Sequence, residues 1–150
     1  MLKKKLKIII PTFVVVILIT AIVILNIPYN LNKALRFDES EQLVMSVSTM
    51  KNINGQPESN GEQFTFEKGS AEFTAIINLL DGYSYNLTTA KAIREASHDV
   101  TIIDIYGNNS GVYLSNFAGS NIIVNGKNYR MKQNKVEELL DKILAICGME

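Results

Sequence analysis

The residues best suited to chemistry include a single histidine. His98 is the only one in the 150-residue chain, and Asp99 and Asp104 lie near it in the sequence. A metal site takes three or four ligands, and the serine hydrolases with a Gly-x-Ser-x-Gly turn are not indicated because the chain lacks that motif. We expect His98 to lie in an exposed loop, and we predict no catalytic residue, no metal site and no cofactor.

The chain also has a single cysteine, Cys147, so it cannot form an internal disulfide. A nucleophilic cysteine needs a neighbouring base. Cys147 instead continues the apolar spacing of the last predicted helix, which is typical of a small core residue. We interpret it as structural.

Five of the six tyrosines fall in segments with the alternation of β-strands: Tyr83, Tyr85, Tyr106, Tyr113 and Tyr129. Successive side chains of a strand point to opposite faces of its sheet, so one buried face cannot take all five. Exposed aromatic residues mark interaction sites. We predict partner binding through Tyr83, Tyr85, Tyr106 and Tyr113; the alternative is that these are core and edge residues.

These tyrosines must be positioned by a sheet. Residues that alternate in polarity or are β-branched predict strands near 43–49, 63–68, 83–87, 100–106, 112–117, 122–124 and 129–131. The pair Asn125-Gly126 predicts a tight hairpin, because its turn needs positive φ at both positions. Residues 51–62 are rich in Asn, Gly, Pro and Ser, which predicts a loop. Residues 89–99 fit either a helix or a loop.

Two amphipathic helices are predicted to cover this sheet. The first follows Ser70 as N-cap and ends at Gly82. The second has Asn134 as N-cap with Glu137 three residues later, and it ends at Gly148. Short turns make the strands antiparallel. The predicted fold class is therefore α+β, a two-layer domain with an antiparallel sheet and both helices on one face.

An apolar run precedes this domain. Residues 8–25 carry no charge, and such a run is long enough for a transmembrane helix, which needs about 20 apolar residues. Four lysines stand before it (Lys3, Lys4, Lys5 and Lys7), and the next basic residue is Lys33. This asymmetry orients the N-terminus to the cytoplasm. A cleaved signal peptide is the alternative, but its apolar core is shorter and a small-x-small site follows it.

The sequence thus predicts four regions: a basic cytoplasmic tail (1–7), an anchor in the lipid bilayer (8–27), a juxtamembrane connector (28–40) and an extracytoplasmic domain (41–150). The predicted location is the cell membrane, with a single pass. Without the four N-terminal lysines, 11 of the 15 basic residues remain against 15 acidic residues. An acidic outer region argues against a nucleic-acid partner, which requires a basic face.

The lysine-rich start, the anchor and the hairpin over residues 122–129 resemble small membrane-anchored extracytoplasmic proteins of unknown function from Gram-positive bacteria. The resemblance implies no activity. The sequence favours a non-enzymatic module that binds a protein or a cell-envelope component. Two alternatives stay open, a small envelope-associated hydrolase and an inhibitor or immunity-type protein.

Overall fold

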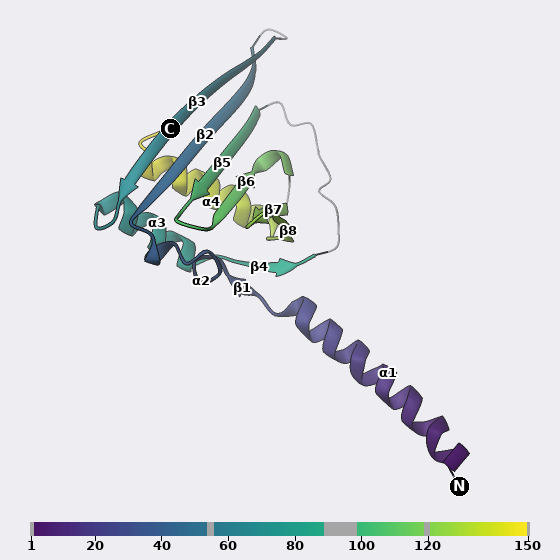
Figure 1. Ribbon diagram of the computed structural model, residues 1–150. Coiled ribbons are helices and arrows are strands. Elements are labelled where there is room, and N and C mark those ends of the chain that lie inside the picture. Colours follow the sequence, from purple (N-terminus) through teal and green to yellow (C-terminus); the bar gives the residue numbers. More distant parts are fainter. Residues whose placement is uncertain (1, 54–55, 89–98, 119–120, 150) are drawn as a thin grey trace.

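The computed structural model describes residues 2–53, 56–88, 99–118 and 121–149. Its main element is an eight-stranded antiparallel sheet with the order β1-β4-β8-β7-β6-β5-β2-β3 (Figure 1). The strands are β1 (Tyr29–Asn30), β2 (Gln42–Ile53), β3 (Gln56–Glu67), β4 (Ser84–Leu87), β5 (Asp99–Tyr106), β6 (Gly111–Ser115), β7 (Asn121–Val124) and β8 (Lys127–Arg130). The helices are α1 (Leu2–Asn26), α2 (Leu31–Leu35), α3 (Ala71–Asp81) and α4 (Gln133–Ile146), with 3-10 turns η1 (Phe37–Glu39) and η2 (Asn116–Ala118). The predicted α+β class is confirmed.

The core lies on one face of the sheet. In β5, Ile103 and Ile105 are fully buried, whereas Tyr106 on the other face is exposed. Met45 of β2 and Val112 of β6 are also buried, and they lie directly opposite Ile105 in the register. The buried side chains of α3 and α4 belong to the same apolar cluster. Both helices therefore lie behind the strands in Figure 1, and neither covers the face in front.

Helix α3 forms as predicted. The Ser70 hydroxyl accepts a hydrogen bond from the Phe73 N–H at 3.0 Å, which satisfies one of the free donors of the first turn. Phe73, Ile76 and Leu80 are buried on one stripe, and the helix ends before Gly82. The local signals of this segment and its packing agree, so its prediction from sequence is confirmed.

Helix α4 begins earlier than predicted. Its N-cap is Lys132, which makes no side-chain capping bond, so Asn134 lies inside the helix and no capping box forms. Met131 and Val136 are both buried. They flank the N-cap at the positions of a hydrophobic staple, which fixes the entry of the chain by apolar contact. Core burial, rather than the capping residue, therefore determines where α4 begins; Gly148, at positive φ, ends it as predicted.

The loop predicted over residues 51–62 is wrong. β2 and β3 pair continuously from Gln42↔Glu67 to Ile53↔Gln56, so nearly all of this polar segment is strand. Residues 58–63 are exposed. A strand that is solvated on both faces has no apolar alternation, and its backbone pairing alone defines it. The polar composition of residues 51–62 therefore reflects solvent exposure of the two strands and not irregular structure.

Residues 28–40, predicted as a connector, form part of the domain. Leu31, Leu35 and Phe37 are at most 1% exposed and belong to the core. The Leu31 N–H donates to the Tyr83 carbonyl at 2.8 Å, and the Asn32 amide donates to the Asp81 carboxylate at 3.0 Å. The domain therefore starts near residue 29 rather than at residue 41. Its N-terminal segment was missed because its apolar run is short.

The predicted bilayer segment, residues 8–27, lies almost entirely in α1, which projects away from the sheet (Figure 1). The side chains described in this helix run over residues 11–24, and they are exposed. Over the described part of the chain, no helix is long and apolar enough to cross a membrane. The uncertain segment 89–99 lies outside the described residues, apart from Asp99 at the start of β5.

Candidate binding site on the open face of the sheet

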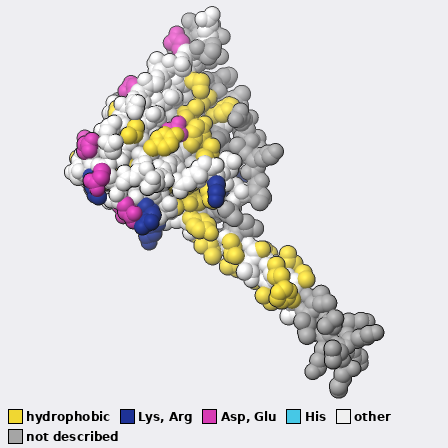
Figure 2. Space-filling view, in the orientation of Figure 1, with side chains coloured by type: hydrophobic (Ala, Val, Ile, Leu, Met, Phe, Trp, Pro, Cys, Tyr) yellow, Lys and Arg dark blue, Asp and Glu magenta, His cyan; other side chains and the backbone are white. Residues whose placement is uncertain are grey.

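A concavity of about 650 Å³ lies on the sheet face that the helices leave open. It is formed where the β5–β6 turn and the β7–β8 hairpin come together. Asp104 of β5 lies opposite Tyr113 of β6, and Tyr113 lies opposite Ile123 of β7. Figure 2 shows hydrophobic side chains gathered on this side of the molecule, with an acidic side chain among them. The sheet register thus sets aromatic, apolar and acidic groups in one row.

Tyr106 is the most exposed aromatic residue of the concavity, at 52%. Its position depends on Gly111, its partner across the strands. A Cβ atom on Gly111 would lie 2.7 Å from Cδ1 and 2.9 Å from Cε1 of the Tyr106 ring. The ring therefore lies across the glycine backbone, where any side chain would displace it. The inner side of the Tyr106 ring lies against the sheet, and its outer side is exposed to solvent.

The turn that follows Tyr106 is fixed to the core. The Gly107 N–H donates to the Ser110 carbonyl at 2.9 Å, and the Ser110 hydroxyl donates to the Leu35 carbonyl. The Ser40 hydroxyl accepts from the Asn108 N–H at 3.1 Å. Because these bonds join the turn to the segment at residues 35–40, the edge of the concavity is held by the core.

The neighbouring hairpin supports the same glycine. Asn125 and Gly126 both have positive φ, as the sequence predicted. The Asn125 side-chain oxygen accepts from the Gly111 N–H at 3.0 Å, and the Asn125 N–H donates to the Gly111 carbonyl at 2.9 Å. Asn125 therefore closes the turn and also attaches it to the strand under Tyr106.

The electrostatics of the concavity favour neutral or cationic ligands. Burial raises the pKa of Asp104 above its ordinary value, and the Asp104 charge raises the pKa of Tyr106. The Tyr106 hydroxyl lies 3.5 Å from the Asp104 carboxylate. Among the described lining residues there is no Lys or Arg. A partly desolvated carboxylate beside a phenol favours a hydrogen-bond donor and disfavours an anion.

The four predicted tyrosines separate into two pairs. Tyr106 and Tyr113 both line the concavity. Tyr83 and Tyr85 are each only 6% exposed and belong to the core, so they do not form an exposed patch. Tyr85 stacks on Tyr29 with ring centroids 5.7 Å apart and contacts Tyr129 at 4.6 Å. The alternative interpretation, core and edge residues, therefore holds for Tyr83 and Tyr85.

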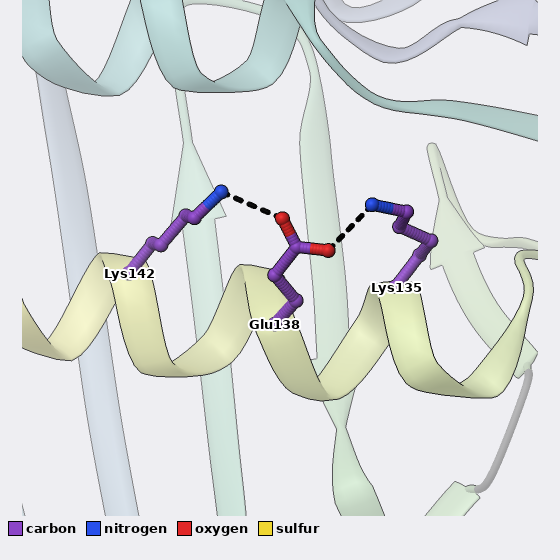
Figure 3. A network of polar contacts seen from close by, with 3 residues as sticks. All are labelled: Lys135, Glu138 and Lys142. Atoms are coloured by element: carbon purple, nitrogen blue, oxygen red, sulfur yellow. Dashed lines mark hydrogen bonds and ion pairs between the residues drawn. The ribbon is translucent and has the colours of Figure 1, made fainter.

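Tyr83 is covered by an ionic bridge on α4. The Glu138 carboxylate accepts from Lys135 and Lys142, each at 2.6 Å (Figure 3). The two ammonium groups lie 6.0 Å and 5.8 Å from the Tyr83 ring centroid. Hydrogen bonds from the two lysines lower the pKa of Glu138 to about 2. This polar cluster lies over the buried ring, and Tyr83 and Lys135 also line a smaller hollow of about 300 Å³ between the start of β4 and the start of α4.

The other candidates for chemistry do not assemble. His98 lies outside the described residues. Burial raises the pKa of Cys147 to about 11, so its thiol stays protonated at neutral pH. Within the described part of the chain, no three His, Cys, Asp or Glu side chains are placed to hold a metal ion. The side chains of Lys3, Lys4, Lys5 and Lys7 are not among those described.

Sequence reasoning missed two residues of the site. Gly111 was not singled out from the sequence, and Asp104 was considered only as a neighbour of His98. The usable signal was register: a tyrosine and a glycine that flank a short turn face each other across the strands, and the glycine leaves room for the ring. Comparisons with protein-family models, curated proteins and solved structures found no match for this chain.

Proposed function

We propose that this protein is a non-enzymatic, membrane-anchored extracytoplasmic module that binds a protein or cell-envelope component. One observation carries the binding role: Tyr106 remains half exposed although it is held in place across Gly111. A rigid ring supplies contact area at low entropic cost, and its hydroxyl gives orientation. A surface that orders an aromatic side chain in solvent is suited to recognition.

The anchor is supported by the apolar surface of α1. From Phe13 to Ile24 its large apolar side chains are 46–65% exposed. Exposed apolar area of this extent costs free energy in water and marks contact with a membrane or a partner. In the sequence, residues 8–25 carry no charge, and an uncharged run of this length is long enough for a transmembrane helix. The lysines before it orient the N-terminus to the cytoplasm.

The partner class follows from the concavity. Its lining combines two tyrosines with the exposed Asn108 and Asn109 and one carboxylate. We therefore expect an uncharged or cationic surface with hydrogen-bond donors, on a protein or a glycan, rather than a phosphate-rich polymer.

Site-specific photo-crosslinking in the native cell tests the binding role. A photoreactive residue replaces Tyr106 in the full chain, and a matched control carries it at Asp141, which is exposed on α4. We expect a discrete cross-linked species from position 106 and none from position 141. Equal products from both positions, or none from position 106 in a chain that is folded and present in the membrane, would contradict the proposal.

The topology needs its own measurement. A C-terminal fusion to alkaline phosphatase is expected to be active, because that enzyme requires the extracytoplasmic compartment, and a fusion to a fluorescent protein that folds only in the cytoplasm is expected to be dark. The reverse pattern would contradict the extracytoplasmic location.

His98→Ala is expected to leave the cellular role of the protein intact. Loss of that role in the variant would favour the hydrolase.

A further inference from the structure

β3 is an edge strand of the sheet. It pairs with β2 over its whole length and has no partner on its other side among the described residues (Figure 1). An edge strand directs alternate N–H and C=O groups away from the sheet, where another chain can pair with them. Pro57 lacks an N–H, so the usable edge starts at Glu58 and continues to Glu67.

A hollow lies alongside the last part of this edge. Its volume is about 450 Å³, and it is open to solvent between β3 and the C-terminal end of α4. Phe64 and Phe66 line it from the strand with their rings stacked 6.1 Å apart, and Ile146 and Cys147 line it from the helix. These side chains are buried or half-buried, so the floor of the hollow is apolar.

The surroundings of the edge are acidic. Glu58, Glu62, Glu67 and Glu72 lie on β3 and in the first turn of α3, and none of the four makes an ion pair with another described residue. Lys68 is the one basic residue between positions 56 and 73, and it pairs with Glu41 at 3.4 Å. The edge therefore presents net negative charge beside an apolar hollow, with Lys51 of β2 opposite Glu58 as the one cross-strand cation in the register.

We propose that the β3 edge binds an extended basic peptide segment of another protein, which adds to the sheet as a ninth strand. In such additions the main chain supplies hydrogen bonds, and pockets for alternate side chains supply selectivity. An apolar side chain of the segment fits the hollow between Phe64, Phe66 and Ile146. Glu62 shares a face of β3 with Phe64 and Phe66, and Glu67 lies on the opposite face. A lysine or arginine two residues from the apolar side chain therefore meets Glu62, and one next to it meets Glu67.

A second copy of this chain fits the edge less well. Two β3 strands paired with each other would bring both sets of glutamates into one interface, and like charges across strands are destabilising. A basic segment neutralises the same charges instead. The surface is separate from the Tyr106 concavity: it is the outer edge of the sheet on its helix side, so it can act independently of the proposed function.

The test uses the full chain in a nonionic detergent and a labelled nine-residue peptide. The peptide has a central valine, lysines at the positions next to it and two residues from it, and threonines elsewhere. One control peptide carries glutamate in place of lysine. A second control keeps the sequence but is N-methylated at alternate residues, which removes the main-chain donors of one edge. We expect measurable binding by fluorescence anisotropy for the first peptide alone, and slower amide hydrogen exchange in β3 when it is bound.

Charge variants complete the test. Glu62→Gln with Glu67→Gln is expected to weaken the peptide about fivefold, since exposed ion pairs are worth little individually. Asp38→Asn with Asp141→Asn removes the same charge from exposed positions elsewhere and is expected to leave binding unchanged. Equal binding of either control peptide, or protection in β3 caused by self-association without peptide, would overturn the proposal.

Discussion

Two pairs of tyrosines, alike in the sequence, have opposite environments in the fold. Tyr83 and Tyr85 lie on the covered side of the sheet, in the core, whereas Tyr106 and Tyr113 lie on the open face. All four occupy strand-like alternation. Alternation states which residues share a face, but the positions of α3 and α4 decide which face is buried. The same residue type therefore contributes stability in one pair and accessible surface in the other.

The two faces also differ in the environment that each gives to a carboxylate. On the covered side, Glu138 on α4 is paired with two lysines, which lower its pKa to about 2. On the open face, burial without a cation raises the pKa of Asp104. The first arrangement stabilises the folded chain with its carboxylate ionised, and the second costs stability at neutral pH. Such a cost is typical of a site kept for binding.

The largest expected effect separates the tyrosine pairs by stability. Tyr85→Ala removes a buried ring that contacts Tyr29 and Tyr129, and we expect it to lower the free energy of unfolding by about 3–5 kcal/mol, the range for buried aromatic truncations. Tyr106→Ala should cost about 0.5 kcal/mol or less. Denaturant unfolding of the full chain measures both; similar losses in the two variants would refute the assignment of faces.

Two glycines of one turn provide the next contrast. A Cβ on Gly107 would lie 2.9 Å from the fully buried Phe37 ring, so Gly107→Ala overpacks the core and should cost about 1–3 kcal/mol. In Gly111→Ala the clash is with the exposed Tyr106 ring, which can rotate away. That variant should keep its stability and lose partner capture. Thermal unfolding and cross-linking from Tyr113 distinguish the two outcomes, and equal destabilisation would contradict them.

The bridge over Tyr83 predicts an acid-dependent loss. Because the folded pKa of Glu138 is lowered from 4.5 to about 2, its stabilisation is complete above pH 4.5 and is lost as the pH falls through about 2. Glu138→Gln should therefore unfold at a lower temperature than the unsubstituted chain at pH 7, with the difference closing toward pH 2. A difference that is independent of pH would show that the ion pairs contribute nothing.

The raised pKa of Asp104 predicts a pH dependence of stability with the opposite sign, and this is the smallest of the expected effects on stability. Its folded pKa is raised from 3.8, so the favourable protonated form is lost as the pH rises through the folded pKa. Asp104→Asn should raise the unfolding temperature at pH 7 and have no effect below pH 3.8. The gain should be within about 0.5 kcal/mol. A loss of stability at pH 7 would mean that the Tyr106 hydroxyl stabilises the ionised carboxylate by more than its burial destabilises it.

Much of this fold is predictable from sequence where local signals and burial agree. Ser70 caps α3, and Asn125-Gly126 forms its hairpin because the left-handed backbone needs those residues. The failures have a common cause. The extent of β3 and the start of α4 depend on pairing and packing with distant segments. A single sequence indicates the local conformational preference of each segment, and long-range contacts override that preference.

The candidate site was predictable only in its components. The sequence predicts all four tyrosines as surface residues on the same grounds. Only the position of the core separates Tyr106 and Tyr113, which are accessible, from Tyr83 and Tyr85, which are buried. The role of Gly111 required knowledge of the register, because its contact with Tyr106 crosses two strands. The raised pKa of Asp104 depends on burial, which no local pattern reports.

Partner capture by the full chain is the most direct test of the central claim. The double variant Tyr106→Ala with Tyr113→Ala is compared with Met50→Ala, which removes an exposed apolar side chain outside the concavity. A tyrosine hot spot is commonly worth at least about 2 kcal/mol, or about thirtyfold in affinity. We predict at least that loss for the double variant and no change for Met50→Ala. Undiminished capture by a folded double variant would contradict the account.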